Sequence, residues 1–547
     1  GRVLRRITLF ASLLLSACAL EPPDLPPTDV IPSPEQAAYQ EMEFIGFIHF
    51  SMNTFTDMEW GFGDESPELF NPTALDTDQW ARVAAEVGMG ELILTAKHHD
   101  GFTLWPSEYS HHSVADSPWR EGGGSVVGEF VESARRNGVR VGLYLSPWDR
   151  NHPEYGRDAY LDAYRGQLRE LLTQFGEVTE IWVDGANGGT GYYGGANEER
   201  RIDRATYYRW PETMGLVKEL QPRTLIFSDA GPDIRWMGNE RGHAGETNWS
   251  TIDTDGIVIG DADTEYLNTG DPQGDQWVVP LCNTSIRPGW FYHATQDDQV
   301  KTPQELVDLY YRSVGRNCVL LLNVPPDRRG LFHERDVETL REFRRILDET
   351  FAVNLAMDAE VTADNVRGRH RKFGAGNVVD QRAETPDGVG GGGRGGSVAP
   401  GRTEISGRRA DDRSAAPRIA GSGRNPSIVP PGAVTGNTQT YWAADDDRRS
   451  AVLEVRLPRV STFDRVLLQE PIRLGQRISG FSVEAMIGGE WRKVARGTTV
   501  GYKRILRISP VSTDRTRFII EDALAPPAIS NLGLFLASSD EGSAPSG

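Results

Sequence analysis

The sequence predicts an α/β protein whose first domain is a (β/α)8 TIM-like barrel and whose second domain is an antiparallel β-sandwich. From about residue 40 to residue 350, short apolar segments alternate with amphipathic helical segments, as in a parallel sheet covered by helices. After about residue 440 the pattern changes to short alternating strands, which favours a sandwich. A chain of 547 residues also usually needs more than one hydrophobic core.

The expected strands of the first domain are buried apolar runs. They cover about 44–50, 91–97, 139–145, 180–184, 224–228 and 318–324, with two more expected between residues 250 and 300. The expected helices cover about 77–88, 125–137, 158–175, 206–220, 303–315 and 334–348. Thr77 or Asp76 can cap the first helix and Gly88 can close it. A doubly wound open sheet is the alternative, but no glycine-rich phosphate motif follows any strand.

The barrel is expected at 39–350 and the sandwich domain at 351–547, with residues 351–380 contributing its first strands. An insert at about 386–428 is rich in glycine and arginine, has little to bury and is expected to be flexible. Trp442 and Trp491 either pack within this domain or bind a sugar there. Packing is the favoured interpretation.

The N-terminus has the pattern of a secretory signal. Three arginines precede an apolar run that ends in "LSAC" at Cys18, so residues 1–18 resemble a bacterial lipoprotein signal with Cys18 as the lipidated residue. An ordinary signal peptide is the alternative. The proline-rich residues 19–38 are expected to form an extended tether. The expected location is periplasmic or cell-envelope, with the membrane reached only through this anchor.

Composition narrows the class of ligand. The formal net charge of -20 opposes binding to nucleic acid or to anionic membrane surfaces, and a neutral ligand fits better. The 13 tryptophans offer flat apolar surfaces for such a ligand, although many tryptophans simply pack in cores. Cys282 and Cys318 either form a disulfide or remain as two buried thiols.

Several strands end in residues that can do chemistry. In a barrel the carboxyl ends of all strands meet on one face, which gathers His49, His98, His99, Tyr144 and Asp184. Adjacent residues on a strand point to opposite faces, so His98 and His99 are not expected to bind one metal ion together. No cysteine or Glu-x-x-His companion supports a metal site there.

Seven motifs in order give a more specific indication. They are "FIHFSMNTFTDMEWGFGDE", "LTAKHHDGFTLWPS", "GLYLSPWDRN", "IWVDGA", "FSDAGPDIRWMGNE", "SIRPGWFYH" and "VLLLNVPPDRRG". Over about residues 40–350 the chain resembles the α-L-fucosidases of glycoside hydrolase family 29, and within them the branch that prefers α-1,3/1,4 linkages.

The resemblance implies a retaining exo-α-L-fucosidase that acts on fucosylated glycans. Such an enzyme needs one ionised carboxylate as nucleophile and one protonated carboxyl as acid/base. The motifs imply Asp184 for the first role and Glu240 for the second, with Glu240 on the loop after the 224–228 strand. Apolar neighbours such as Trp236 can keep a glutamate protonated. Rivals for the acid/base role are Glu59, Glu65 and Glu246.

The resemblance also implies a sugar-binding set and no metal or organic cofactor. Fucose is a 6-deoxy sugar, so its pocket must serve hydroxyl groups and one methyl group. The implied set is His49, Glu59, Trp60, His98, His99, Tyr144, Trp236 and Trp290. The alternatives are a non-catalytic surface carbohydrate-binding protein on the same barrel and a glycosidase of this fold acting on another sugar.

Two further features have structural interpretations. Asp149 and Arg150 are expected to pair and hold a loop. The acidic run at 253–265 lacks the spacing of a calcium-binding EF-hand loop and is expected to be a solvated loop.

Overall fold

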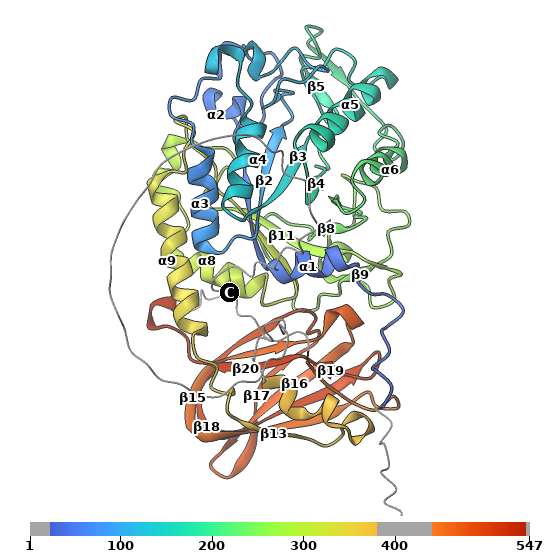
Figure 1. The fold of residues 1–547 in the computed structure, drawn as a ribbon, viewed down its shortest axis with the longest axis vertical. Helices are drawn as coiled ribbons and strands as arrows, with labels where there is room; N and C mark the ends of the chain where they lie inside the picture. Colours follow the sequence, from blue (N-terminus) through green and yellow to red (C-terminus); the bar gives the residue numbers. More distant parts are fainter. Residues whose placement is uncertain (1–21, 380–439, 543–547) are drawn as a thin grey trace, which may run out of the picture.

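The computed structural model describes residues 22–379 and 440–542 and contains two domains stacked along the long axis of the molecule (Figure 1). The upper domain in this view is a barrel surrounded by helices, and the lower domain is built from antiparallel strands. The expected insert at 386–428 and the residues 1–21, which include Cys18, lie outside the described residues.

The upper domain confirms the predicted TIM-like barrel. Eight strands close in the order β1-β12-β11-β8-β7-β4-β3-β2, and every neighbouring pair is parallel. The strands are β1 Phe44–Ile48, β2 Glu91–Lys97, β3 Arg140–Leu145, β4 Glu180–Trp182, β7 Leu225–Phe227, β8 Ile234–Trp236, β11 Val279–Ser285 and β12 Val319–Asn323. Most are buried along their whole length, which explains their near-continuous apolar sequence.

One expectation about the strands is wrong. Two barrel strands were expected between residues 250 and 300, but only β11 lies there, because β8 already lies at Ile234–Trp236. Within 250–300 a separate two-stranded ribbon, β9 Thr251–Ile252 with β10 Gln276–Trp277, stands outside the barrel. The hairpin of β5 Gly189–Gly191 and β6 Glu198–Arg200 is likewise separate from it.

Helices cover the outside of the barrel (Figure 1). They are α3 Thr77–Val87, α4 Val126–Arg136, α5 Asp158–Gln174, α6 Trp210–Leu220, α8 Pro303–Arg312 and α9 Glu334–Phe351, with the shorter α2 Met52–Thr56 and α7 Thr264–Thr269 in loops. The Asp76 side chain accepts a hydrogen bond from the backbone of Gln79 and caps α3. Gly88 ends α3 with a φ of 87°, a conformation that suits glycine.

The lower domain confirms the predicted antiparallel architecture. Its main sheet has the order β13-β15-β18-β16-β17, and β20 also pairs with β15. The strands are β13 Glu360–Ala363, β15 Ala451–Gln469, β16 Ile478–Ile487, β17 Glu490–Gly497, β18 Arg504–Ala523 and β20 Asn531–Phe535, with a small pair formed by β14 Trp442–Ala443 and β19 Ala528–Ile529. Trp442 is buried in this domain, and Trp491 packs under Arg515 and Arg517. Both tryptophans therefore pack, as the sequence favoured.

The proline-rich segment is anchored along its described part. Leu25 is buried in a cluster with Phe373, Ala443 and Ala528 of the lower domain. The Arg477 side chain donates a 2.5 Å hydrogen bond to the carbonyl of Pro26, and helix α1 already begins at Pro34 and ends at Met42. Residues 22–38 are thus docked on the protein, which corrects the expectation of an extended tether over 19–38.

The two cysteines form a disulfide. Cys282 in β11 is bonded to Cys318, the residue before β12, with 6.1 Å between their Cα atoms. Both residues are buried. The bond ties two neighbouring barrel strands together.

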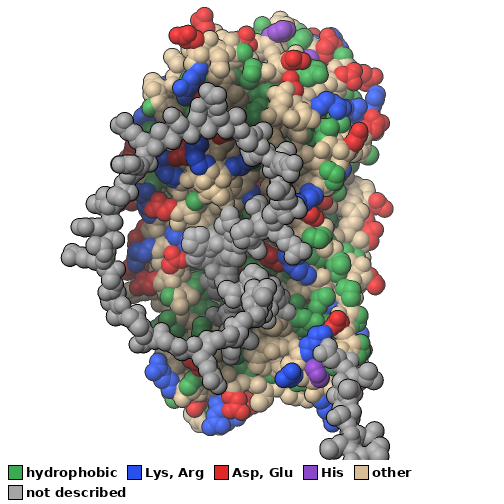
Figure 2. Space-filling model, viewed as in Figure 1, with side chains coloured by type: hydrophobic (Ala, Val, Ile, Leu, Met, Phe, Trp, Pro, Cys, Tyr) green, Lys and Arg blue, Asp and Glu red, His purple; other side chains and the backbone are tan. Residues whose placement is uncertain are grey.

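The surface carries charges of both signs. On the uncovered part of the face in Figure 2, acidic and basic side chains are interspersed. In the described part of the chain, no helix combines the length and the apolar character needed to cross a bilayer.

Candidate active site

A cavity of about 430 Å³ lies at the carboxyl ends of the barrel strands. Its wall includes residues from or just after five strands that the sequence analysis selected. Of the predicted site residues the lining contains His49, Trp60, His98, His99, Tyr144, Asp184, Trp236, Glu240 and Trp290. The predicted convergence on one face is therefore present, and Glu59 is the one predicted binding residue within the described chain that is not in the lining.

Asp184 lies two residues after β4 and is held by two hydrogen bonds. The Tyr144 hydroxyl donates to its Oδ2 at 2.9 Å, and the backbone N–H of Ala186 donates to its Oδ1 at 2.8 Å. Its side chain is 27% exposed, so one side of the carboxylate remains open to the cavity. Burial and the charge of Asp184 raise the pKa of Tyr144 well above 10, which keeps its hydroxyl a donor.

Glu240 lies four residues after β8, at the mouth of the same cavity. Burial and the negative charge of Asp184 raise the pKa of this carboxyl above its usual value, while a hydrogen bond from the Trp290 side chain acts in the opposite direction. The sequence placed Glu240 after the strand at 224–228, whereas the structure inserts β8 between that strand and Glu240. The site therefore places the carboxylate of Asp184 in one cavity with a second carboxyl, Glu240, whose raised pKa favours its protonated form.

Three histidines line the cavity in neutral form, because burial lowers the pKa of each. For His49 the pKa falls to about 4. The Nδ1 of His49 lies 2.8 Å from Oδ1 of Asn323. Since an amide oxygen only accepts, this His49 nitrogen carries the proton and its Nε2 is left as an acceptor.

The orientation of His99 follows from a chain of hydrogen bonds. The Ser146 hydroxyl donates to the carbonyl of Trp148 at 2.7 Å, so its oxygen accepts the proton of His99 Nδ1 at 2.7 Å. The Nε2 of His99 lies 3.9 Å from Oδ2 of Asp184 and offers a lone pair. Buried Nδ1 of His98 has no partner in the described chain. These nitrogens can accept or donate hydrogen bonds to sugar hydroxyls.

Glu59 positions a neighbouring loop instead of lining the cavity. Its carboxylate accepts hydrogen bonds from the backbone of Trp290 at 2.5 Å and of Phe291 at 3.1 Å, and it lies 2.8 Å from Nε2 of His293. Asn323 holds the same loop from the other side by donating to the carbonyl of Trp290 at 2.8 Å. Glu59 thus supports the placement of Trp290, and its oxygens are occupied.

The other acids raised as rivals to Glu240 lie outside the cavity lining. Glu65 accepts hydrogen bonds from the backbone of Phe62 and Gly63. Glu246 lies on the surface near Arg316, where its side chain is 74% exposed. Neither is placed to protonate a leaving group beside Asp184.

Five polar residues of the lining were not among the predicted site residues: Arg204, Asp229, Asp261, Thr264 and Asn283. Burial raises the pKa of Asp229 to about 6, and its Oδ2 accepts a 2.8 Å hydrogen bond from the backbone of Gly260. Asn283 accepts a 3.0 Å hydrogen bond from the Trp236 indole and so orients that ring. Asp229 lies two residues after β7, so the strand-end rule that gathers His49 and Asp184 also applies to it.

Two other expectations need correction. Asp149 forms a buried ion pair with Lys97 at 3.2 Å, while Arg150 donates to the carbonyl of Gly61, so the expected Asp149–Arg150 pair is not formed. The acidic run at 253–265 is not simply a solvated loop, because Gly260 and its neighbours to Thr264 contribute to the cavity wall.

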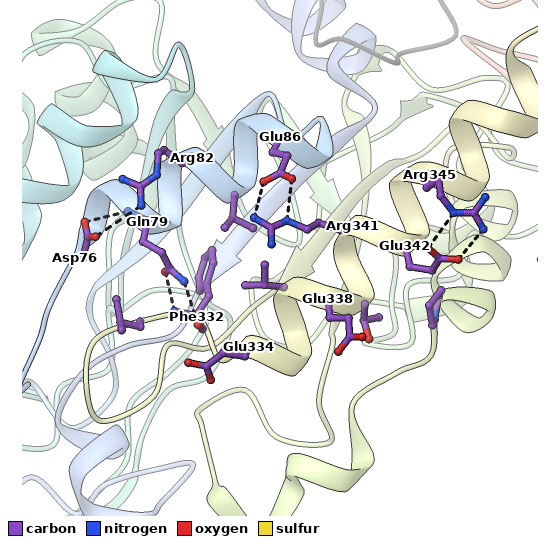
Figure 3. Close-up of a pocket in the computed structure, with 15 residues that line it drawn as sticks. Asp76, Gln79, Arg82, Glu86, Phe332, Glu334, Glu338, Arg341, Glu342 and Arg345 are labelled. Carbon is purple, nitrogen blue, oxygen red and sulfur yellow. Dashed lines mark hydrogen bonds and ion pairs between the residues drawn. The ribbon is translucent and has the colours of Figure 1, made fainter.

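A second, larger groove of about 1070 Å³ lies on the outside of the barrel between α3 and α9 (Figure 3). Its charged side chains pair with one another: Arg341 binds Glu86 and Arg345 binds Glu342. These are exposed helix-surface pairs, which contribute little energy each. The lining of this groove shares no residue with the cavity at the strand ends.

Comparisons with known proteins agree on one family. Residues 34–349 match the α-L-fucosidase family model, and residues 432–518 match a model described as a NedA-like, galactose-binding domain. Alpha-L-fucosidase 1 of Arabidopsis thaliana is 38% identical over 96% of this chain and 92% of its own length.

Two solved structures extend the agreement to three dimensions. A glycoside hydrolase 29 family member from an unknown rumen bacterium is 38% identical, with a TM-score of 0.75 over 94% of this chain and 79% of its own. A Ruminococcus gnavus GH29 fucosidase in complex with fucose is 29% identical, with a TM-score of 0.77 over 95% of this chain and 98% of its own.

Proposed function

The chain belongs to the α-L-fucosidases of glycoside hydrolase family 29, and from this premise we propose that it is a retaining exo-enzyme that prefers α-1,3- and α-1,4-linked fucose. Family membership makes it an α-L-fucosidase, a glycoside hydrolase. The proposal adds the stereochemical course, the linkage and the roles of individual residues. The observation that supports it most is that Asp184 and Glu240 line one cavity and the charge of Asp184 raises the pKa of Glu240.

In the proposed first step, Asp184 attacks the anomeric carbon of the terminal fucose while Glu240 gives its proton to the departing glycosidic oxygen. The fucosyl carbon then forms a bond to a carboxylate oxygen of Asp184 and loses its bond to the rest of the glycan. The hydrogen bonds from Tyr144 and Ala186 N–H fix the carboxylate, which favours attack because small misplacements cost large factors in rate.

In the proposed second step, Glu240 acts as a base. Once Asp184 is esterified it carries no negative charge, so the electrostatic effect that raises the pKa of Glu240 disappears. The pKa of Glu240 then falls, and its carboxylate can accept a proton from water that attacks the anomeric carbon. Fucose leaves and both carboxyl groups return to their starting states.

The pocket walls fit a 6-deoxy sugar. Acceptor nitrogens of His49 and His99 can bind hydroxyl hydrogens, and aromatic rings such as Trp236 and Trp290 can pack against the methyl group. The preference for α-1,3/1,4 linkages is the most specific part of the proposal. It rests on the resemblance of the "RWMGNE" segment, which carries Glu240, to the branch of the family with that preference.

The test compares a branched α-1,3/1,4-fucosylated trisaccharide with an aryl α-L-fucoside, using wild type and Glu240→Gln. We expect wild type to cleave both, with α-fucose as the first product by proton NMR. Glu240→Gln should lose about 10²- to 10⁴-fold on the trisaccharide and far less on an aryl fucoside with a good leaving group, which needs little protonation.

Other outcomes each remove one part of the proposal. First-formed β-fucose would contradict retention. Cleavage of the aryl fucoside alone would contradict the linkage preference while leaving the reaction intact. Equal losses on both substrates would remove Glu240 as the acid.

A further inference from the structure

We propose that this chain contains a binding site for one divalent cation beneath the loops that carry Trp60 and His99. The site lies outside the cavity lining and takes ligands from two segments, residues 53–65 and residues 100–112. The proposed ligand residues are Asn53, Glu65, Asp100 and His112.

Three of these side chains bring their ligand atoms together. One oxygen each of Glu65 and Asp100 and one ring nitrogen of His112 all lie within 4.8 Å of one another. Asp100 is fully buried and His112 is 3% exposed. Three of their atoms have no hydrogen-bond partner in the described chain: both carboxyl oxygens of Asp100 and the Nε2 of His112. Native interiors rarely leave such atoms unsatisfied.

Asn53 provides an independent indication. It is fully buried, and its Oδ1 has no hydrogen-bond partner in the residues that the structure describes. Its Nδ2 donates to the carbonyl of Glu59 at 2.9 Å, which fixes the amide, because the opposite orientation would set two oxygens against each other. The unpaired oxygen therefore belongs to the side of the amide away from Glu59.

Gly61 leaves the space that these groups share. A Cβ atom at Gly61 would lie 2.6 Å from Oε1 of Glu65, 2.9 Å from Oδ1 of Asn53 and 2.8 Å from Cβ of Asp100. Any other residue would fill this space. Acceptor oxygens of Glu65 and Asn53, together with the Cβ of Asp100, thus surround a position that the chain keeps free of its own atoms.

The charges around this position are only partly balanced by the protein, since Arg150 acts electrostatically on Glu65 and Asp100, and Lys97 acts on Asp100. No ion pair to Glu65 or Asp100 occurs between described residues, and the nearby Arg150 directs its Nη1 to the carbonyl of Gly61 instead. Burying the Asp100 carboxylate beside the half-buried carboxylate of Glu65 without a direct ion pair is costly. A divalent cation would neutralise both, and it would satisfy the His112 nitrogen and the Asn53 oxygen in the same step.

The ligand set indicates the class of metal. Imidazole nitrogen with carboxylate oxygens suits zinc and similar transition-metal ions. Calcium prefers six to eight oxygen ligands, so a set containing His112 suits it less. The competing possibility is a proton shared between Glu65 and Asp100.

The position of the site indicates its effect. Trp60 lies between the ligands Asn53 and Glu65 in sequence, lines the cavity and packs its ring 5.4 Å from that of His99. Asp100 directly follows His99. A cation that joins these two segments would fix the wall of the cavity without touching the sugar, so its ligands are positioning residues.

The experiment uses the full chain without a histidine tag, dialysed against a chelator and then supplied with Zn²⁺, Mn²⁺ or Ca²⁺. We expect wild type to retain about one equivalent of Zn²⁺ by mass spectrometry of the metal, and its Tm to fall by several degrees after chelation. Asp100→Asn and His112→Gln should lose the metal. Asp64→Asn, an exposed neighbour of Glu65, is the matched control and should retain it.

Gly61→Ala is a second variant that keeps every ligand. Its added methyl group occupies the shared space, so we expect at least a tenfold weaker Zn²⁺ affinity and a higher KM with kcat little changed. This variant decides the matter if Asp100→Asn does not fold. Absence of bound metal from wild type with an unchanged Tm, or metal retained in all three cluster variants, would overturn the proposal. Either result leaves the assignment of Asp184 and Glu240 untouched.

Discussion

Strand β4 carries a carboxylate near each end, and the two have opposite surroundings. Glu180, its first residue, is fully buried at the closed end of the barrel, where its Oε2 accepts a 2.8 Å hydrogen bond from Tyr39. Glu91, the first residue of β2, is buried beside it. Asp184, two residues beyond β4, lines the open cavity near Glu240.

The comparison separates a perturbed pKa from a reactive site. Burial raises the pKa of Glu180 well above its usual value and that of Glu91 to about 7. The charge of Glu91 raises the pKa of Glu180 further, whereas a hydrogen bond with Glu180 lowers the pKa of Glu91. These two carboxyls resemble a catalytic pair in their titration alone. They lack a cavity, whereas Asp184 and Glu240 share one, so access for substrate distinguishes the functional pair.

The strongest test of this comparison exchanges one acid at each end of the strand. Asp184→Asn should lower kcat by a factor on the order of 10³ or more, because an amide cannot form the ester intermediate. Glu180→Gln should leave kcat within about threefold, since its amide oxygen can still accept from Tyr39. Hydrolysis of an aryl α-L-fucoside and thermal melting measure both. Similar losses in the two variants at unchanged Tm would break the comparison.

A second test uses the pH dependence of stability. The unfolded chain releases the proton of Glu91 near its usual pKa of 4.5, whereas the folded chain holds it to about 7. Between these values the folded state binds more protons, so the contribution of Glu91 is fully present below about pH 4.5 and is lost as the pH rises through 7.

Glu91→Gln should therefore flatten the fall in stability between pH 5 and pH 8, measured by urea unfolding at each pH. The exposed Glu212→Gln is the control and should keep the wild-type slope. A slope in Glu91→Gln as steep as in wild type would mean that Glu91 is not the group that holds this proton.

The smallest expected effect concerns the support of the open end. Glu59→Gln weakens the acceptor for the backbone of Trp290 and Phe291, so the Trp290 ring should be less well fixed. We expect KM to rise by up to about tenfold with kcat within about twofold. Initial rates over a range of aryl fucoside concentrations measure the two separately. A fall in kcat of about 10²-fold would instead give Glu59 a part in the chemistry.

The sequence predicted the uniformly apolar strands better than strand β8, which has a charged residue at its centre. Residues 91–97 and 319–323 were located to within a residue or two, because each is a continuous run with one environment. Strand β8 has only three residues, and one of them is Arg235, whose side chain is buried by hydrogen bonds to distant carbonyls. A strand of that length with a charged centre gives no periodic signal.

The candidate site shows the same limit. Five residues belong to strands or follow them within two residues, so barrel topology alone gathers them: His49, His98, His99, Tyr144 and Asp184. The family resemblance implied Glu59 as a binding residue, but its partners are backbone amides 231 and 232 residues away. No local sequence pattern predicts a contact between residues so far apart in the chain.

The docked N-terminal segment has a consequence for synthesis of the chain. Pro26 is bonded to Arg477, 451 residues later, and Leu25 packs against Ala528 near the end of the described chain. On the ribosome, Leu25 and Pro26 therefore emerge long before Arg477 and Ala528, the residues that hold them in place. The segment can dock on the lower domain only after Ala528 has been made, by which time all eight barrel strands have already been synthesised.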